Sequence, residues 1–162
     1  MAAFVILALV TLERLGELWL AHHNTKALLQ RGAVEHAAAH YPLIVLLHAA
    51  WLAGLYWFAP QATIHMVWLL VFCVLQGLRI WVLATLGPRW TTRIIVLPAT
   101  PLVRTGPYRF VSHPNYAVVI GEIAVLPLVF GLSLYALIFS ILNAGVLCIR
   151  IRAENAALAR GV

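Results

Sequence analysis

Long apolar runs separated by short polar segments dominate the sequence. The runs cover residues 3–21, 41–58, 64–86, 114–130 and 132–154. An α-helix needs about 20 predominantly apolar residues to cross the hydrocarbon core of a bilayer, and each run is close to that length. The pattern therefore predicts an all-α integral membrane protein with about five transmembrane helices.

Glycine and proline mark where several of these helices end. Gly87-Pro88 ends the third run, because both residues interrupt a helix. Gly131 leaves almost no chain between the last two runs, which are therefore expected to form a tight helical hairpin.

The first run lacks a basic segment before it and a clear cleavage site, so we expect a retained helix and not a signal peptide. We expect one membrane domain over residues 1–162, with the chemistry-bearing motifs in about residues 76–160.

The composition supports a lipid environment. Hydrophobic residues make up 64% of the chain and charged residues only 10%, whereas a soluble domain carries about 25% charged residues. The spans leave no room for a soluble catalytic domain, so any activity must be built from helix ends and loops. The formal charge of +6 does not indicate a nucleic-acid partner, because Lys and Arg are concentrated in loops and at helix ends. No obligate protein partner is indicated.

The basic residues also predict an orientation. The connections 22–40 and 87–113 and the C-terminal tail hold nearly all of them, whereas the N-terminus and residues 59–63 hold none. With five spans these two groups fall on opposite sides, and the basic side is expected to be cytoplasmic. The N-terminus is then outside and the C-terminus inside. Trp90, in the second basic connection, is expected to be an interfacial anchor.

Two polar features leave alternatives open. Glu13 and Glu17 are four residues apart and share a helix face. They either reach the headgroups from a helix end or face the protein interior, lining a polar cavity or pairing with Arg79. Residues 22–40 contain several histidines, but their spacing lacks the Cys or carboxylate framework of a metal site. An amphipathic interfacial segment is favoured over a metal site there, and no metal ligand is predicted.

The segment between the third and fourth runs is polar, turn-forming and aromatic, and residues 106–116 read GPYRFVSHPNY. Gly106-Pro107 and His113-Pro114 predict a loop, since proline fixes φ, lacks an N–H and keeps the preceding residue extended. The apolar run that follows carries one carboxylate, Glu122. A titratable, donor-rich loop at the mouth of a membrane helix is suited to a chemical site. The alternative is an interfacial loop with Tyr and Arg anchors.

Together with the end of the last run, this loop resembles the isoprenylcysteine carboxyl methyltransferase family and the related phospholipid methyltransferases. The family pattern is Gly-Pro-Tyr, then Arg-His-Pro-x-Tyr, then an apolar hairpin, then Arg-x-x-x-Glu-Glu. The matching residues here are Gly106, Pro107, Tyr108, His113, Pro114, Asn115, Tyr116, Arg150 and Glu154. Ser112 stands where the family usually has Arg, and Asn155 stands where it has the second Glu. The resemblance covers about the last 90 residues.

The N-terminal half resembles a bacterial branch of that family. The residues that carry this likeness are Glu13, Arg14, Glu17, Gly32, Ala33, Glu35, His40, Tyr41, Pro42 and His48. Members of the branch are associated with type III polyketide synthases and O-methylate alkylpyrones or alkylresorcinols. The resemblance thus implies a protein of a bacterial cytoplasmic membrane, with its active site on the cytoplasmic side.

The resemblance implies S-adenosylmethionine as the methyl donor and a lipophilic acceptor that enters laterally from the membrane lipid. The residues implied to bind the donor are Leu102, Val103, Gly106, Tyr108, His113, Pro114, Tyr116, Glu154 and Asn155. An acceptor carboxylate or acidic enol needs a cation to orient it, and Arg160, Arg150 and Arg79 are the candidates. With Glu154, Arg160 and Arg79 are the expected catalytic residues. A phenolic acceptor with a pKa of about 10 would need a base, for which His113 is the candidate.

Two other functions stay open from the sequence. A phospholipid N-methyltransferase resembles the same motifs. A non-enzymatic membrane scaffold or transporter subunit would fit the small size of the chain, but it would leave the loop 106–116 and Glu154 without a shared purpose.

Overall fold

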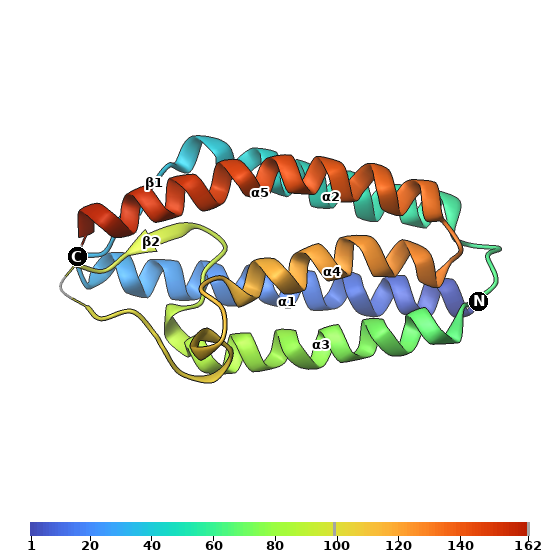
Figure 1. The fold of residues 1–162 in the computed structure, drawn as a ribbon, viewed down its shortest axis with the longest axis horizontal. Helices are drawn as coiled ribbons and strands as arrows, with labels where there is room; N and C mark the ends of the chain where they lie inside the picture. The colour runs from blue at the N-terminus through green and yellow to red at the C-terminus, as the bar shows by residue number, and fades with distance from the viewer. Residues whose placement is uncertain (99, 162) are drawn as a thin grey trace.

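The computed structural model describes residues 1–98 and 100–161, and it describes side chains as far as Ala159 apart from the gap at 99. Within this part the long helices are α1 (Ala2–Gln30), α2 (Tyr41–Phe58), α3 (Met66–Leu86), α4 (Pro114–Val129) and α5 (Ser133–Gly161). They run along one axis of the molecule, and the start of α1 and the end of α5 lie at its opposite ends (Figure 1). Short 3-10 helices, η1 (Ala38–His40), η2 (Gly87–Arg89) and η3 (Gly106–Arg109), lie in the connections.

The helical membrane class predicted from the apolar runs is confirmed. The structure is 77% helical. Three helical segments, Ala38–Phe58, Met66–Arg89 and Ser133–Ala159, are long and apolar enough to cross a membrane by length and composition. Helix α4 is apolar but shorter, and α1 is interrupted by charged residues between residues 13 and 17. Large apolar side chains on the outside of the bundle, such as Leu9, Leu46 and Ile141, are exposed, as lipid-facing residues would be.

Helix α1 is longer than the sequence pattern predicted, because its polar end is held by tertiary contacts. Ala21, Asn24 and Leu28 lie on one face of this end and are buried. The amide Nδ2 of Asn24 donates to the carbonyl oxygens of Gly87 at 3.1 Å and Trp90 at 2.8 Å. The first nine residues of the expected 22–40 connection are therefore helical.

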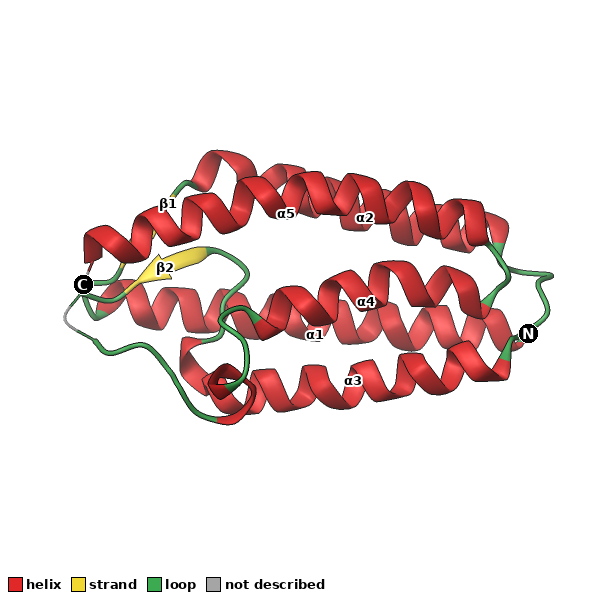
Figure 2. Cartoon of the chain, in the orientation of Figure 1, coloured by secondary structure: helices red, strands yellow, loops and turns green. Residues whose placement is uncertain are grey.

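The purely α-helical expectation was wrong in one respect, since the two basic connections pair as a small sheet (Figure 2). Strand β1 (Val34–His36) lies antiparallel to β2 (Ile94–Val96), with Val34 opposite Val96 and His36 opposite Ile94. Branched side chains suit a pleated, half-buried strand. Ile94 and Val96 pack against Ala157 of α5. The sheet therefore joins both connections to the C-terminal end of α5.

The hairpin between α4 and α5 is confirmed. Gly131 has a φ of +71°, in the left-handed region that favours glycine, and its N–H donates to the carbonyl of Leu128 at 3.0 Å. Helix α4 contacts both α3 and α5. The apolar core lies around this part of the bundle and includes the fully buried side chains of Leu7, Leu55, Ile123 and Leu126.

A cluster of charged side chains lies inside the bundle and connects α1, α3 and α4. Arg79 is 5% exposed, and Glu17 and Glu122 are 8% and 3% exposed. The guanidinium of Arg79 donates to both carboxylates, with an Nη1–Oε2 distance of 2.7 Å to Glu122. Arg14 and Gln76 also donate to Glu122, at 2.9 Å and 3.0 Å. Of the two sequence alternatives for Glu17, pairing with Arg79 is therefore the correct one.

Candidate functional site

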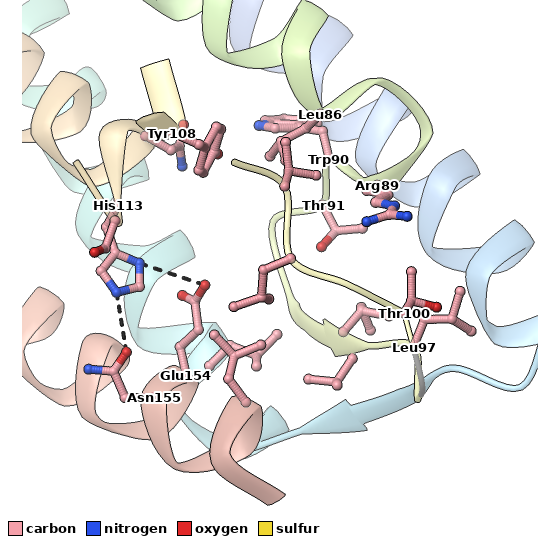
Figure 3. A pocket seen from close by; sticks show the side chains of 18 of the residues that line it. Leu86, Arg89, Trp90, Thr91, Leu97, Thr100, Tyr108, His113, Glu154 and Asn155 are labelled. Atoms are coloured by element: carbon pink, nitrogen blue, oxygen red, sulfur yellow. Dashed lines mark hydrogen bonds and ion pairs between the residues drawn. The ribbon is translucent and has the colours of Figure 1, made fainter. Parts of the chain in front are cut away.

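A cavity of about 820 Å³ opens at the end of the bundle that carries the small sheet (Figure 3). Its walls come from the segment between α3 and β2, from residues 100–116, from the first turn of α4 and from the end of α5. Pockets for small ligands and cofactors usually have volumes of about 300–1,000 Å³. The cavity is therefore large enough for a nucleoside-sized ligand.

Glu154 and Asn155 of α5 face His113, which lies at the start of α4 (Figure 3). The Nε2 atom of His113 lies 3.2 Å from Oδ1 of Asn155, and its Nδ1 atom lies 3.9 Å from a carboxylate oxygen of Glu154. The hydroxyl of Tyr116 donates to the other carboxylate oxygen of Glu154. The rings of His113 and Tyr116 stack with centroids 5.3 Å apart. The loop motif and the α5 motif therefore form one polar and aromatic wall.

Arg150 supports this wall from one turn earlier on α5, where its side chain is buried. Its Nε donates to the hydroxyl of Tyr116 at 2.8 Å, and its Nη2 donates to the carbonyl oxygen of Thr92 at 2.8 Å. Because the Tyr116 hydroxyl accepts from Arg150, its own proton is directed to Glu154. Arg150 thereby fixes the orientation of Glu154 and ties α4 and α5 to the segment before β2.

Other polar groups also belong to the cavity wall, and two of them have no hydrogen-bond partner among the described residues. The indole Nε1 of Trp90 and the amide Oδ1 of Asn115 are buried and have no hydrogen-bond partner among the described residues. Burial, together with the negative charge of Glu154, raises the pKa of Tyr108 to about 12. The phenol of Tyr108 therefore stays protonated at neutral pH and can donate a hydrogen bond. Buried polar groups without partners are uncommon, so Trp90 and Asn115 indicate a place for ligand atoms.

The cavity wall is strongly basic. Glu154 is the one carboxylate among its described residues, whereas the arginines on the wall are Arg89, Arg93, Arg104, Arg109 and Arg150. Arg89 donates to the carbonyl of Pro101 at 2.8 Å, and Arg93 pairs with Glu35 at 2.7 Å. In the described part Arg104 and Arg109 form no ion pair. These two guanidiniums are available to an anion.

The residues singled out from the sequence divide into four groups. Those that line the cavity are Leu102, Val103, Tyr108, His113, Tyr116, Glu154, Asn155 and Arg150. Gly106 and Pro114 lie beside it, and Arg79 belongs to the buried ion cluster, away from the wall. Helix α5 includes Arg160, but the side chain of that residue lies outside the described part.

Gly106 and Pro114 shape the loop instead of lining it. Gly106 has a φ of +54°, and a Cβ there would lie 2.5 Å from the hydroxyl oxygen of Thr85. Glycine is therefore required where η3 approaches the end of α3. Pro114 is the first residue of α4, a position where the missing N–H costs nothing. Together they hold Tyr108 and His113 at the cavity wall.

Replacing Gly106 by alanine is expected to destabilise the protein by about 1–3 kcal/mol, because the positive φ and the contact with Thr85 are both unfavourable for a Cβ. Thermal unfolding in detergent would measure the change. Gly77→Ala is the matched control, since a Cβ at Gly77 meets no atom within 4 Å. Equal melting temperatures for the two variants would show that the Gly106 turn tolerates a side chain.

Sequence reasoning missed several residues of the wall. Trp90 was expected to be an interfacial anchor, but it is buried, with 2% of its surface exposed. Arg93 and Ile94 reach the cavity only because β1 and β2 pair, and three-residue strands leave no periodic signal. The sequence places Asn115 in the loop motif but predicts no role for it. Its position between Pro114 and Tyr116 was the sequence feature that could have indicated its place in the cavity wall.

Comparisons with known proteins agree with this geometry. The chain matches the isoprenylcysteine carboxyl methyltransferase (ICMT) family over residues 67–160. It is 36% identical over 168 residues to the uncharacterised protein YpbQ of Bacillus subtilis (strain 168), and the match covers 96% of this chain and 95% of that protein. An uncharacterised protein of Haemophilus influenzae (strain ATCC 51907 / DSM 11121 / KW20 / Rd) is 24% identical over 158 residues, covering 90% and 88% of the two chains. No solved structure matches the chain.

The family match covers more than half of the chain and includes every element that forms the cavity from α3 to the end of α5. It contains both motifs on which the resemblance was first based. The three apolar helices long enough to span a membrane agree with an integral membrane protein. This chain therefore belongs to the isoprenylcysteine carboxyl methyltransferase family, a family of membrane methyltransferases.

Proposed function

We propose that the protein is an S-adenosylmethionine-dependent methyltransferase that methylates an anionic oxygen of a lipophilic acceptor taken from the bilayer. One observation carries the proposal: both family motifs line a single cavity, where Tyr116 and His113 flank the carboxylate of Glu154. The cavity lies at the end of an apolar bundle, so a polar donor can enter from water while the acceptor's tail stays in lipid.

The residues of the wall fit the donor. Glu154 can accept from the ribose hydroxyls or the amino group of the donor, and its carboxylate is oriented by Tyr116. The unpartnered indole N–H of Trp90 and amide oxygen of Asn115 suit an adenine or amino-acid moiety. Tyr108 and His113 add a hydrogen-bond donor and an aromatic face. When bound, S-adenosylmethionine supplies a methyl group activated by a sulfonium.

The charge of the wall favours an anionic acceptor over an amine. Arg104 and Arg109 line the cavity without ion pairs in the described part, and a guanidinium matches a carboxylate through two parallel hydrogen bonds. A carboxylate or an acidic enol is anionic at neutral pH and needs no base. The nitrogen of an amine acceptor would gain no such pair, because a guanidinium donates hydrogen bonds and accepts none.

The chain's own contribution to the reaction is mainly alignment and exclusion of water. We propose that Arg104 or Arg109 orients the acceptor. Arg160 remains a further candidate from the sequence. Arg79 is proposed to stabilise the bundle, because both sides of its guanidinium already contact carboxylates. For a phenolic acceptor such as an alkylresorcinol, His113 is the proposed base.

Incubating membranes that contain the protein with radiolabelled S-adenosylmethionine tests the function. Four acceptors should be compared: a prenylcysteine, an alkylpyrone, an alkylresorcinol and phosphatidylethanolamine. We expect label in one of the first three and none in the phospholipid. Label in phosphatidylethanolamine would overturn the proposal that the acceptor is an anionic oxygen. If none of the four acceptors were labelled and the protein did not bind the donor, the proposed methyltransferase activity would be overturned.

We further propose five spans, with the N-terminus outside and the cavity on the cytoplasmic side, since the basic connections lie at the cavity end. In a background with Cys73 and Cys148 replaced by alanine, Ala62→Cys should react with an impermeant thiol reagent in intact cells. Thr105→Cys should react only after the cells are permeabilised. The opposite pattern would invert the orientation.

A further inference from the structure

A second groove, of about 420 Å³, lies on the α1 and α2 side of the small sheet. One face of α1 forms its long wall, and the residues on that face are Leu18, Ala21, His22, Thr25, Lys26 and Leu29. Glu35 of β1, Tyr41 of α2 and the Thr92-Arg93 pair close the other side. The function proposed above does not use this groove.

The groove is polar at one end and apolar at the other. Lys26, Arg93 and Tyr41 lie at the sheet end, whereas Leu18 lies about two turns further along α1 toward the middle of the bundle, with Ala21 between it and Lys26. From residue 18 to residue 29 a helix rises by about 16 Å, which spans a lipid headgroup and the upper part of an acyl chain. Leu18 and Leu29 are each 43% exposed, so the groove borders the lipid.

The charge of the groove is positive. Its one described carboxylate, that of Glu35, pairs with Nη1 of Arg93 at 2.7 Å, which leaves the other guanidinium nitrogens of Arg93 without a partner among the described residues and Lys26 as the unpaired charge. The guanidinium of Arg93 also lies over the ring of Tyr41, 4.6 Å from the centroid, which fixes its position. Lys26 is exposed and forms no ion pair within the described part. An ammonium and a fixed guanidinium at the lipid boundary are complementary to a phosphate group.

The polar end also offers neutral donors. The hydroxyls of Tyr41 and Thr92 lie 3.1 Å apart in a hydrogen bond, and the Thr92 carbonyl accepts from Arg150. These contacts fix the segment that separates the groove from the cavity, and Arg93 lines both. We propose that the groove is a binding site for an anionic glycerophospholipid, with its phosphate between Lys26 and Arg93 and an acyl chain along Leu18.

The proposal is independent of the methyl transfer and is tested without donor or acceptor. Native mass spectrometry of the purified protein in detergent would compare phosphatidylglycerol with phosphatidylcholine of the same acyl chains. We expect phosphatidylglycerol to bind more tightly. Lys26→Gln should weaken it about fivefold, since one basic residue near an anionic lipid contributes about 1 kcal/mol.

Arg31→Gln is the matched control, because Arg31 is exposed near the same end of α1 but does not line the groove. A second variant, Thr25→Trp, fills the groove while keeping its charges and should remove phosphatidylglycerol binding at an unchanged melting temperature. Equal binding of the two lipids, or equal losses in Lys26→Gln and Arg31→Gln, would overturn the site. Displacement of the lipid by millimolar inorganic phosphate would overturn the assignment to a lipid, because a free anion would then suffice.

Discussion

Replacing Glu154 by glutamine is expected to weaken S-adenosylmethionine binding roughly 5- to 150-fold, equivalent to about 1–3 kcal/mol. Glu154 is the single described carboxylate of the cavity wall, and the hydroxyl of Tyr116 is directed to it by Arg150. The amide of glutamine keeps the size of the side chain but loses the charge and one acceptor. Calorimetry with the donor on purified protein in detergent would measure the change.

Arg152→Lys is the control for this experiment. Arg152 is exposed on the same helix, two residues before Glu154, and it does not line the cavity. The Arg152→Lys variant should bind the donor with the affinity of the parent protein. The donor affinity of Tyr116→Phe should lie between those of Glu154→Gln and Arg152→Lys, because this change removes the hydroxyl that orients Glu154 but leaves the carboxylate in place. Parental affinity in Glu154→Gln would move the donor site away from the end of α5.

The helices were predictable because lipid imposes a simple rule on the sequence. Every buried backbone group must be paired inside its own segment, so apolar length alone identifies a span. The rule fails at the end of α1, where the structure continues the helix to Gln30. At the end of α1 the decisive contacts are long-range hydrogen bonds from Asn24, and no local pattern encodes them.

The candidate site was predictable to the extent that it rests on two sequence motifs. The hairpin at Gly131 returns α5 to the end of the bundle where α4 began, which places Glu154 beside His113. The other half of the wall was not predictable. Trp90 and Arg93 reach the cavity through the pairing of β1 with β2, and strands of three residues have no readable period.

Replacing Arg79 by leucine is expected to have the largest effect on stability, about 3–5 kcal/mol, because it leaves two carboxylates buried without their main partner. Arg79 lies between Glu17 of α1 and Glu122 of α4 and contacts both. Arg14 can still reach Glu122 at 2.9 Å, but one guanidinium then serves three carboxylates, including that of Glu13. Reversible unfolding in mixed detergent and SDS micelles would measure the loss.

The triple variant Glu17→Leu, Arg79→Leu and Glu122→Leu tests where the stability loss in Arg79→Leu comes from. It separates the destabilisation caused by unpaired buried charges from the stability that the intact ion cluster contributes. Replacing a whole buried ionic group by well-packed apolar residues is often neutral or stabilising, whereas removing one partner is not. We therefore expect the triple variant to recover part of the stability that Arg79→Leu loses, since Arg14 keeps Glu13 as a partner but loses Glu17 and Glu122. Its affinity for S-adenosylmethionine should be that of the parent, because none of the three residues lines the cavity. If the triple variant folded stably but no longer bound the donor, the cluster would have a role in the site, as the sequence first suggested for Arg79.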